Sequence, residues 1–298
     1  MPEAQGPPLS EMIRRRLPEF PHAERKVGRA LSVGPPTLGL ESSTHLGELV
    51  GASGPTVIRF VNRLGFGTYA DFQQAWREQL DARFASPAEV YAKHRPETDA
   101  AARVARRTEG SCAAIRDTFE QLPNHELELA AELLSGAPGR VIVFGGWFTQ
   151  VLAHHLAALL QEVRPDVVLL EPTPSGRATV LVDVTKRDVA VAFDFRRYES
   201  DTLVVARHLA GRRARVIALT DRWRSPVAEV STAVLVAATE PAEPFESLVP
   251  ALVLVEMLVA TVVDALGSTV GPRLQALSQI AGALIPAWSR PDVSNTGI

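Results

Sequence analysis

The chain has 298 residues, of which 46% are hydrophobic and 22% are charged. This balance is typical of a folded globular protein and excludes a disordered chain. At roughly 150 residues per domain, the length predicts two domains. The 31 basic and 34 acidic residues give a net charge of −3, which excludes a protein whose main property is a global positive field.

The sequence predicts neither export nor membrane insertion. Residues 1–6 lack the basic-then-apolar pattern of a secretory leader, and the single Cys112 cannot form an internal disulfide. The longest apolar run, residues 248–266, contains Glu256 and Asp264. Because each carboxylate costs a few kcal/mol in lipid, this run predicts a buried helix. We expect a cytoplasmic protein without a membrane partner.

A helical segment opens the chain. Apolar residues in 9–80 recur at three- and four-residue steps, the spacing of amphipathic helices. Prolines and glycines interrupt the pattern, so we expect several short helices. Nine basic and eight acidic residues give residues 1–80 a net charge of +1, so the basic excess lies at the front. We place a helical domain at 1–80 and a linker at 81–104.

Residues 44–64 have the pattern of two helices joined by a tight turn. Apolar residues mark an inner face on each helix, and Gly51 between them permits the bend. Ser53 suits the N-cap of the second helix, and Pro55 suits its first turn, where a missing N–H costs nothing. The pattern therefore predicts a helix-turn-helix. The expected inner-face residues are Leu46, Leu49 and Val50 in the first helix and Val57, Ile58 and Val61 in the second.

The outer face of the second helix carries no acidic residue. Its outward residues are expected to be Thr56, Arg59, Asn62 and Arg63. A helix that enters the phosphate-walled major groove of DNA needs such a face, and Arg59 or Arg63 could contact a guanine edge. The same pattern also fits a helix pair that only packs, with its arginines on a solvated face. The spacing alone leaves both interpretations open.

A longer motif favours DNA binding. The order Arg59-Phe60-(x)₃-Leu64-Gly65-Phe66-Gly67-Thr68-Tyr69-Ala70-Asp71-Phe72 resembles the N-terminal domain of RpiR/MurR-type bacterial transcription regulators. The resemblance implies a helix-turn-helix whose second helix recognises an operator in double-stranded DNA, usually as a dimer. The residues that it places on the DNA are Ser53, Thr56, Arg59 and Arg63.

From residue 105 the chain takes the pattern of an α/β domain. Short apolar runs alternate with helical patterns at 150–160 and 201–210. Such runs are typical of buried parallel strands, and the alternation predicts a doubly wound parallel sheet within 105–267. We expect residues 268–298 to form a C-terminal tail. The expected strands are 140–144, 167–170, 180–182, 189–193, 216–219 and 233–237.

The first predicted strand ends in Gly145-Gly146-Trp147-Phe148-Thr149. A glycine-rich turn from strand to helix is a ready anion site, because free helix N–H groups converge there. The order resembles the SIS domain of RpiR-type regulators, in which a Gly-x-Gly-x-Ser turn holds a sugar phosphate. The resemblance implies that Gly145, Gly146 and Thr149 bind a ligand, with Trp147 standing at the second glycine position.

A second segment, 188–202, is similar to the turn Ile-Ser-Phe-(x)₂-Tyr-Ser of the same domain. Asp194 stands where the family has a phosphate-facing serine, and a carboxylate close to a phosphate repels it by about 1 to 4 kcal/mol. Arg196 and Arg197 could offset Asp194, either by pairing with it or by clamping an anionic ligand. The ligand-binding residues expected outside the glycine turn are Asp194, Arg196, Arg197, Tyr198 and Ser247.

The sequence leaves open which ligand the domain binds and how many subunits assemble. A ligand with an amine, hydroxyl or weak-acid group fits as well as a sugar phosphate, and the domain could also be degenerate and mainly dimerise. Residues 248–266 contain more apolar side chains than a single core-facing stripe of a helix needs. The additional side chains are explained either by contact with a second subunit or by burial in the core of the same subunit. We expect a homodimer or a dimer of dimers.

Two functions fit this organisation. The first is a transcription regulator whose helical domain binds operator DNA and whose SIS-like domain senses a small sugar or sugar-phosphate-like metabolite. The second is a sugar-phosphate isomerase of the SIS fold, with Glu171, Glu246, His154 or His155 as the general base. None of these candidates lies in a catalytic motif, so we expect a regulator and not an enzyme. Adjacent histidines point about 100° apart on a helix, so we expect no metal, and we expect no other cofactor.

Overall fold

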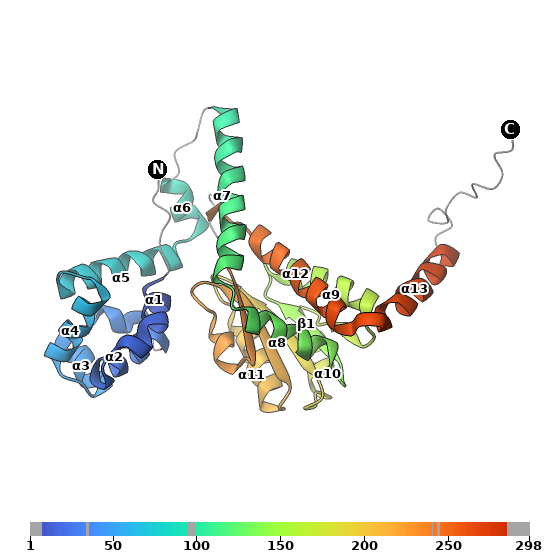
Figure 1. Cartoon of the computed structure of the whole chain (residues 1–298), viewed down its shortest axis with the longest axis horizontal. Helices are drawn as coiled ribbons and strands as arrows, with labels where there is room; N and C mark the ends of the chain where they lie inside the picture. The colour runs from blue at the N-terminus through green and yellow to red at the C-terminus, as the bar shows by residue number, and fades with distance from the viewer. Residues whose placement is uncertain (1–7, 34–35, 94–98, 240, 243–244, 285–298) are drawn as a thin grey trace. The chain divides into compact units, whose positions relative to one another are not determined.

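The structure is a computed structural model, and it describes residues 8–33, 36–93, 99–239, 241–242 and 245–284. The chain divides into two compact units, which Figure 1 draws as ribbons. The helical unit comprises residues 1–103 with 241–246, and the sheet unit comprises residues 104–240 with 247–298. Each unit has an apolar core of its own.

The helical unit consists mainly of short helices, as the spacing of apolar residues in 9–80 predicts. Large side chains from successive helices, among them Ile13, Leu46, Phe60 and Phe72, form its fully buried core. The short strands β6 (Pro241–Ala242) and β7 (Phe245–Glu246) pair with each other and are grouped with this unit. The helices are α1 (Leu9–Arg16), α2 (His22–Val33), α3 (Ser43–Val50), α4 (Gly54–Leu64), α5 (Tyr69–Phe84) and α6 (Pro87–Lys93), with 3-10 turns at Leu17–Glu19 and Pro36–Leu40.

Helices α3 and α4 are joined by a short turn of the predicted kind. Gly51 ends α3 with a φ of 66°, a left-handed conformation that favours glycine. Ser53 is the N-cap of α4, and its Oγ accepts a hydrogen bond from the backbone N of Thr56 at 3.3 Å. Gly65, with a φ of 107°, ends α4. Local chemistry therefore fixes both ends of α4.

The predicted inner faces of these helices are wrong at two positions. Leu49 and Ile58 are exposed, whereas Val57, Phe60, Val61 and Leu64 form the buried face of α4. The buried positions follow the helical steps of three, four and seven residues from Val57. Ile58 lies one step of about 100° away from Val57, which carries its side chain off that face.

The segments expected to be a linker and a C-terminal tail contain helices. The predicted linker 81–104 includes the end of α5, all of α6 and the start of α7 (Ala100–Gln121). The predicted tail 268–298 includes α13 (Val270–Leu284), which follows a 3-10 turn at Gly267–Thr269, and the remainder of that tail lies outside the described residues. Prolines and polar residues in these segments separate helices rather than prevent them.

The sheet unit is a doubly wound α/β layer structure, as predicted. Its five strands are all parallel and stand in the order β2-β1-β3-β4-β5. Helices α8, α9 and α12 contribute to the core on one face, and α11 contributes to the core on the other. The strands are β1 (Val141–Gly145), β2 (Val167–Leu169), β3 (Val189–Asp194), β4 (Arg215–Asp221) and β5 (Ala233–Ala237). The helices are α8 (Asn124–Ser135), α9 (Gln150–Val163), α10 (Pro174–Leu181), α11 (Ser200–Gly211) and α12 (Val249–Leu266).

One predicted strand is wrong. Residues 180–182 lie at the end of α10 and not in the sheet. Helix α10 begins after Thr173, whose side chain accepts a hydrogen bond from the backbone N of Gly176, and Pro174 occupies its first turn. This N-cap starts a helix, and a run of three apolar residues is too short to indicate a strand by itself.

The long apolar run near the C-terminus forms a core helix. By length and hydropathy alone, the segment Val249–Leu284 could cross a membrane. Helix α12, however, buries Leu254, Val255, Leu258 and Val262 in the core that it shares with α8, α9 and the sheet. Packing within the unit therefore explains the apolar residues on the side of α12 that faces this core.

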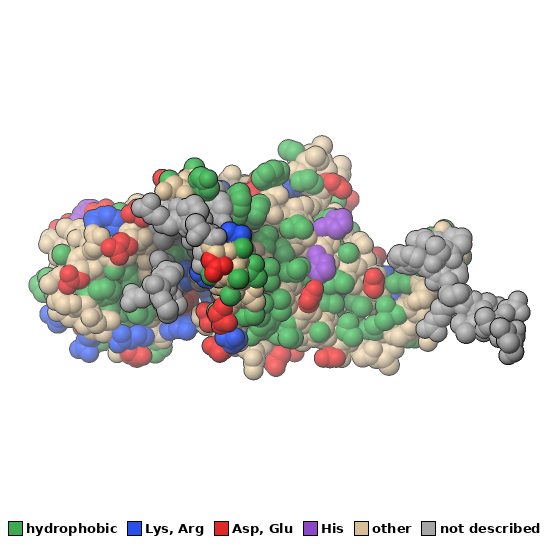
Figure 2. Space-filling model, turned by 90° about the horizontal axis from the view of Figure 1, so that it is seen from above, with side chains coloured by type: hydrophobic (Ala, Val, Ile, Leu, Met, Phe, Trp, Pro, Cys, Tyr) green, Lys and Arg blue, Asp and Glu red, His purple; other side chains and the backbone are tan. Residues whose placement is uncertain are grey.

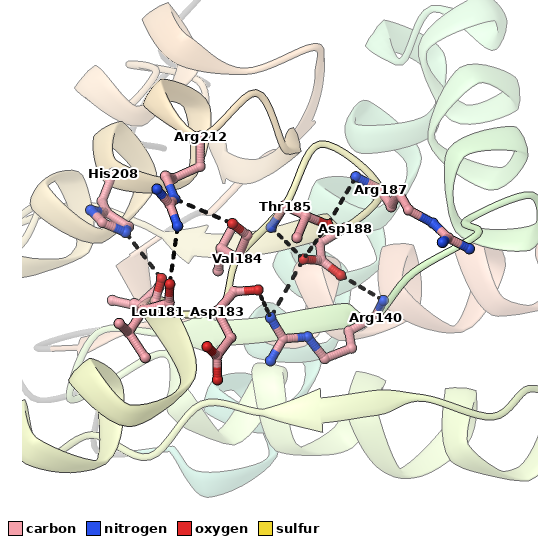
Figure 3. A network of polar contacts seen from close by, with 10 residues as sticks. Arg140, Leu181, Asp183, Val184, Thr185, Arg187, Asp188, His208 and Arg212 are labelled. Carbon is pink, nitrogen blue, oxygen red and sulfur yellow. Dashed lines mark hydrogen bonds and ion pairs between the residues drawn. The ribbon is translucent and has the colours of Figure 1, made fainter.

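At the amino ends of the strands, Asp188 binds several chain segments together (Figure 3). Its Oδ1 accepts from the backbone N of Arg140 at 2.8 Å, and its Oδ2 accepts from the backbone N of Thr185 at 2.8 Å. Burial acts to raise the pKa of Asp188, but these hydrogen bonds and the Arg140 guanidinium outweigh it and lower the pKa. Nearby, Arg212 donates to the backbone oxygens of Val182 and Val184. This edge of the sheet is therefore fastened by side chains.

Candidate functional site

The outer face of α4 carries two exposed arginines. The side chains of Arg59 and Arg63 are 61% and 56% exposed, and Ser53 and Asn62 are also exposed. Figure 2 shows further Lys and Arg side chains at the surface of the helical unit. Four of the five residues predicted to face DNA are thus accessible on this unit.

Thr56 departs from the prediction, because it does not face outward. It is 6% exposed, and its hydroxyl lies 2.8 Å from Oγ of Ser53 and accepts from Nη2 of Arg59 at 3.0 Å. Thr56 directly precedes Val57 on the buried side of α4. Its hydroxyl therefore contacts neighbouring side chains instead of pointing outward.

The sequence analysis did not predict that a buried acidic residue lies beneath α4. Glu24 on α2 is nearly inaccessible, and its Oε2 lies 3.0 Å from Nε of Arg63 while its Oε1 lies 4.0 Å from Nε of Arg59. The outer face of α4 is free of acids in sequence, as predicted, but its arginines have an acidic partner from another helix. No local pattern could indicate it, since residues 24 and 63 are far apart in the chain.

The second candidate site lies at the carboxyl edge of the sheet. Because the strands are parallel and β3 stands between β1 and β4, the segments after Gly145, Asp194 and Asp221 lie along one edge. Open α/β sheets bind their ligands at this edge. The two sequence segments that resemble the SIS pattern are thus brought together there.

The glycine turn after β1 is closed by its own side chains. The backbone N of Gly146 donates to Oγ1 of Thr149 at 2.9 Å, and that hydroxyl donates to the backbone O of Phe193 at 2.8 Å. The backbone N of Gly145 donates to Oε1 of Gln150 at 3.2 Å. Thr149 is buried, whereas Trp147 is 86% exposed. The indole therefore points into solvent and does not fill the turn.

Glu199 lies against this turn. A Cβ placed on Gly146 would be 2.2 Å from Oε1 of Glu199, and one placed on Gly145 would be 2.9 Å from the backbone of Thr149. Close approach requires glycine at Gly145, because a Cβ there would collide with backbone atoms. At Gly146 the obstacle is the end of the flexible Glu199 side chain. An acidic side chain thus stands at the turn where the family resemblance implies a phosphate.

Asp194 is buried at the end of β3. Its Oδ2 accepts from the hydroxyl of Ser225, and its Oδ1 accepts from the backbone N of Glu199 at 3.2 Å. Burial raises the pKa of Asp194 to about 7; these hydrogen bonds oppose the rise, and the charges of Asp221 and Glu199 add to it. Within the described residues Asp194 bonds to Ser225 and Glu199 rather than to either arginine of the following turn.

Asp221 organises the turn after β3 from the neighbouring strand. Its carboxylate is fully buried and accepts from the backbone N of Arg196 at 2.7 Å and from the hydroxyl of Tyr198 at 2.7 Å. It also accepts from the backbone N of Trp223 at 2.9 Å. Arg197, between these two donors, is exposed and has a φ of 66°. The turn is therefore shaped by a carboxylate at the end of the neighbouring strand β4.

Arg177 is a buried cation at the same edge. Its Nη2 donates to the backbone O of Gly145 at 3.1 Å, and its Nη1 lies 2.5 Å from Oδ2 of Asp201 at the start of α11. Its Nε donates to the backbone O of Glu171 at 3.2 Å. Arg177 thus links the end of β1 to α11, and no motif in the sequence indicates it.

The remaining candidates have local roles or lie apart. The Oγ of Ser247 accepts from the backbone N of Val249 at 3.3 Å, at the start of α12. His155 lies 3.6 Å from Glu256 on α12, and Glu171 is exposed. Within the described residues no group of three His, Cys, Asp or Glu side chains is arranged to hold a metal ion.

Comparisons with known proteins agree with this fold. Residues 133–261 match the family model described as "SIS domain". The sugar isomerase domain of an RpiR transcription factor from Sphaerobacter thermophilus has 24% identity and a TM-score of 0.55, and the match covers 58% of this chain and 96% of that one. No curated protein matches the sequence.

Two further solved structures are similar to this chain. The Vibrio vulnificus NanR protein, complexed with ManNAc-6P, has 20% identity and a TM-score of 0.52, and the match covers 93% of this chain and 99% of that one. A phosphoheptose isomerase from Francisella tularensis has 16% identity and a TM-score of 0.48, over 56% and 100% of the two chains. The parallel sheet, its carboxyl-edge turns and the family match together establish that this chain contains a SIS domain, preceded by a helical unit.

Proposed function

We propose that this protein is a DNA-binding transcription regulator of the RpiR type. In this proposal α3 and α4 form a helix-turn-helix, α4 enters the major groove of an operator, and Arg59, Asn62 and Arg63 contact the DNA. Ser53, exposed at the start of α4, faces the DNA with them. The observation that carries the proposal is the pair of exposed arginines on the outer face of a helix that is capped at both ends.

Two further observations support this assignment. The likeness to NanR extends over 93% of the chain, and the likeness to the RpiR sugar isomerase domain extends over 58% of it. The motif from Arg59 to Phe72 resembles the same class of regulator. A helical adaptor without DNA would leave the acid-free, arginine-bearing face of α4 without a role.

The sheet unit is proposed to sense a small sugar or sugar-phosphate-like metabolite. The ligand would lie at the carboxyl edge, against the turn of Gly145, Gly146 and Thr149 and the turn from Asp194 to Tyr198 that includes Arg196 and Arg197. The carboxylates of Asp194 and Glu199 favour hydroxyl or amine groups of the ligand there, because they repel a phosphate. A thermal-shift screen of sugar phosphates, amino sugars and free sugars tests this, since a ligand of the native state raises the melting temperature.

We further propose a cytoplasmic homodimer, which could pair into a dimer of dimers. Several large apolar side chains of α9 and α12 are exposed, among them Val151, Val249 and Met257. Figure 2 shows hydrophobic side chains over much of this face of the sheet unit. A twofold dimer would bury such side chains and present two recognition helices to a palindromic operator. We assign no catalytic residue, metal or cofactor.

Selection from a random duplex library, followed by fluorescence anisotropy, tests the DNA-binding proposal. Arg59→Ala and Arg63→Ala should each weaken binding to the selected duplex by about 1 to 3 kcal/mol if they contact a base. Arg77→Ala, on the exposed surface of α5, is the matched control and should change binding little. Failure of the wild-type chain to select any sequence at low ionic strength would overturn the proposal.

A further inference from the structure

The two arginines on the outer face of α4 share one buried acidic partner. Glu24 lies on α2 with its side chain 5% exposed, and its two oxygens face different arginines. Its Oε2 is 3.0 Å from Nε of Arg63, and its Oε1 is 4.0 Å from Nε of Arg59. Arg59 also donates from Nη2 to Oγ1 of Thr56 at 3.0 Å. One carboxylate and one hydroxyl therefore hold both arginines from the protein side.

These contacts keep each guanidinium near the buried carboxylate, and the hydrogen bond to Thr56 also orients that of Arg59. The group is planar and its donors form a fixed fork, so holding the Nε edge also orients the terminal nitrogens. Nε of Arg63 lies 3.0 Å from Oε2 of Glu24 as an ion pair, without the geometry of a hydrogen bond. The side chains remain 61% and 56% exposed. An arginine that is already ordered loses less rotamer freedom when it binds a partner.

Fold stability alone gives little reason for an acid at this position. Taking a carboxylate out of water is costly even when it is paired, and a well-packed apolar residue often stabilises such a site equally well or better. A negative charge beneath two cations on one helix face, by contrast, attracts both of them toward the protein surface. Glu24 supplies such a charge to Arg59 and Arg63.

We propose that Glu24 is a positioning residue for sequence recognition, holding Arg59 and Arg63 so that they meet base edges rather than phosphates. This inference rests on the proposed function of α4. Glu24 also leaves the three-residue cluster with a single net positive charge, which weakens the sequence-independent attraction that two unpaired arginines would give. Both effects raise discrimination between DNA sequences at the expense of total affinity.

The test compares wild-type protein with Glu24→Gln, which keeps the size of the side chain and removes its charge. Anisotropy titrations use the duplex that the wild type selects and an unrelated duplex, over a series of salt concentrations. The ratio of the affinity for the selected duplex to the affinity for the unrelated duplex should fall about tenfold. This fall corresponds to the loss of about one well-placed arginine contact to a base. Affinity for the unrelated duplex should stay the same or rise, and its salt dependence should steepen, because the released arginines contact phosphates.

Controls separate this role from a structural one. Glu78→Gln removes an exposed carboxylate from α5 and should leave the affinity ratio unchanged. Glu24→Asp keeps the charge but retracts it from the arginines, and it should also lower the ratio; thermal denaturation establishes that each variant is folded. A merely structural Glu24 would weaken both duplexes alike, and an unchanged ratio in both Glu24 variants would overturn the inference. A wild-type chain that selects no sequence would instead overturn the proposed function.

Discussion

The carboxylate of Glu199 lies against the α-carbon of Gly146, so that a Cβ at residue 146 would be 2.2 Å from its Oε1. Glu199 is the N-cap residue of α11, and Gly146 follows β1. The contact therefore joins two turns at the carboxyl edge of the sheet. It places the protein's own negative charge beside the turn that resembles a phosphate-binding loop.

The two glycines of this turn should respond differently to alanine. Gly145→Ala should destabilise the protein by about 1 to 3 kcal/mol, because its Cβ would be 2.9 Å from backbone atoms of Thr149, which cannot move aside. Gly146→Ala should cost less than about 1 kcal/mol, because the atom in its way is the end of a flexible side chain. Urea denaturation of both variants measures the difference, and equal costs would contradict the geometry of the Glu199 side chain.

Asp194→Ser should strengthen the binding of sugar phosphates. The substitution removes a buried carboxyl group where the related turn carries serine. At pH 8, above the Asp194 pKa of about 7, the relieved repulsion amounts to about 1 to 4 kcal/mol for charges a few ångströms apart. Isothermal titration calorimetry with a panel of sugar phosphates measures the gain. Asp183→Ser, an exposed position at the opposite edge, should show none. If Asp194→Ser shows no gain either, the carboxylate is not what excludes a phosphate.

Asp194 should also make stability depend on pH. Burial raises its pKa to about 7, so the folded chain binds this proton more tightly than the unfolded chain does. The resulting stabilisation is complete below the ordinary pKa of an aspartate and is lost as the pH rises through 7; it is on the order of 2 to 4 kcal/mol. Asp194→Asn, which cannot ionise, should therefore gain in melting temperature relative to wild type between pH 5 and pH 8. A constant difference would show that Asp194 ionises normally.

Ser53 should be replaceable by glycine but not by alanine. Its Oγ accepts from the backbone N of Thr56 at the start of α4. Ser53→Ala should cost about 1 kcal/mol, whereas Ser53→Gly should cost only a few tenths, since glycine is tolerated at an N-cap. Denaturant titration followed by circular dichroism compares the two variants. Similar losses would show that the cap contributes little.

Local sequence patterns predicted most helices and strands of this fold, but they did not always predict which side of a helix is buried. The apolar runs at β1, β3 and β4 were identifiable because buried parallel strands are apolar throughout. The run at 180–182 gave the wrong element, because three apolar residues fit the end of a helix equally well. Thr56 was misplaced for a related reason: a polar residue next to the apolar stripe can be buried when its hydroxyl finds partners within the helix.

The charged residues that shape the two candidate sites were the hardest to predict. Arg177 pairs with Asp201 and Glu24 pairs with Arg63, in each case between helices well separated in the chain. No periodicity records such a pairing, and charged residues are exposed in most proteins. Asp221 was closer to prediction, since it lies just after the predicted strand 216–219, and the ends of parallel strands converge at one edge.

The carboxylate of Asp188 links two chain segments at the amino ends of the strands, opposite the candidate ligand site, and so affects local unfolding there. It accepts hydrogen bonds from the amides of both Arg140 and Thr185, two residues that belong to different loops. Rotation of this one side chain would release both amides from their hydrogen bonds at the same time. Hydrogen exchange at these two amides should therefore follow a common opening free energy, which marks the base of the domain as a single cooperative unit.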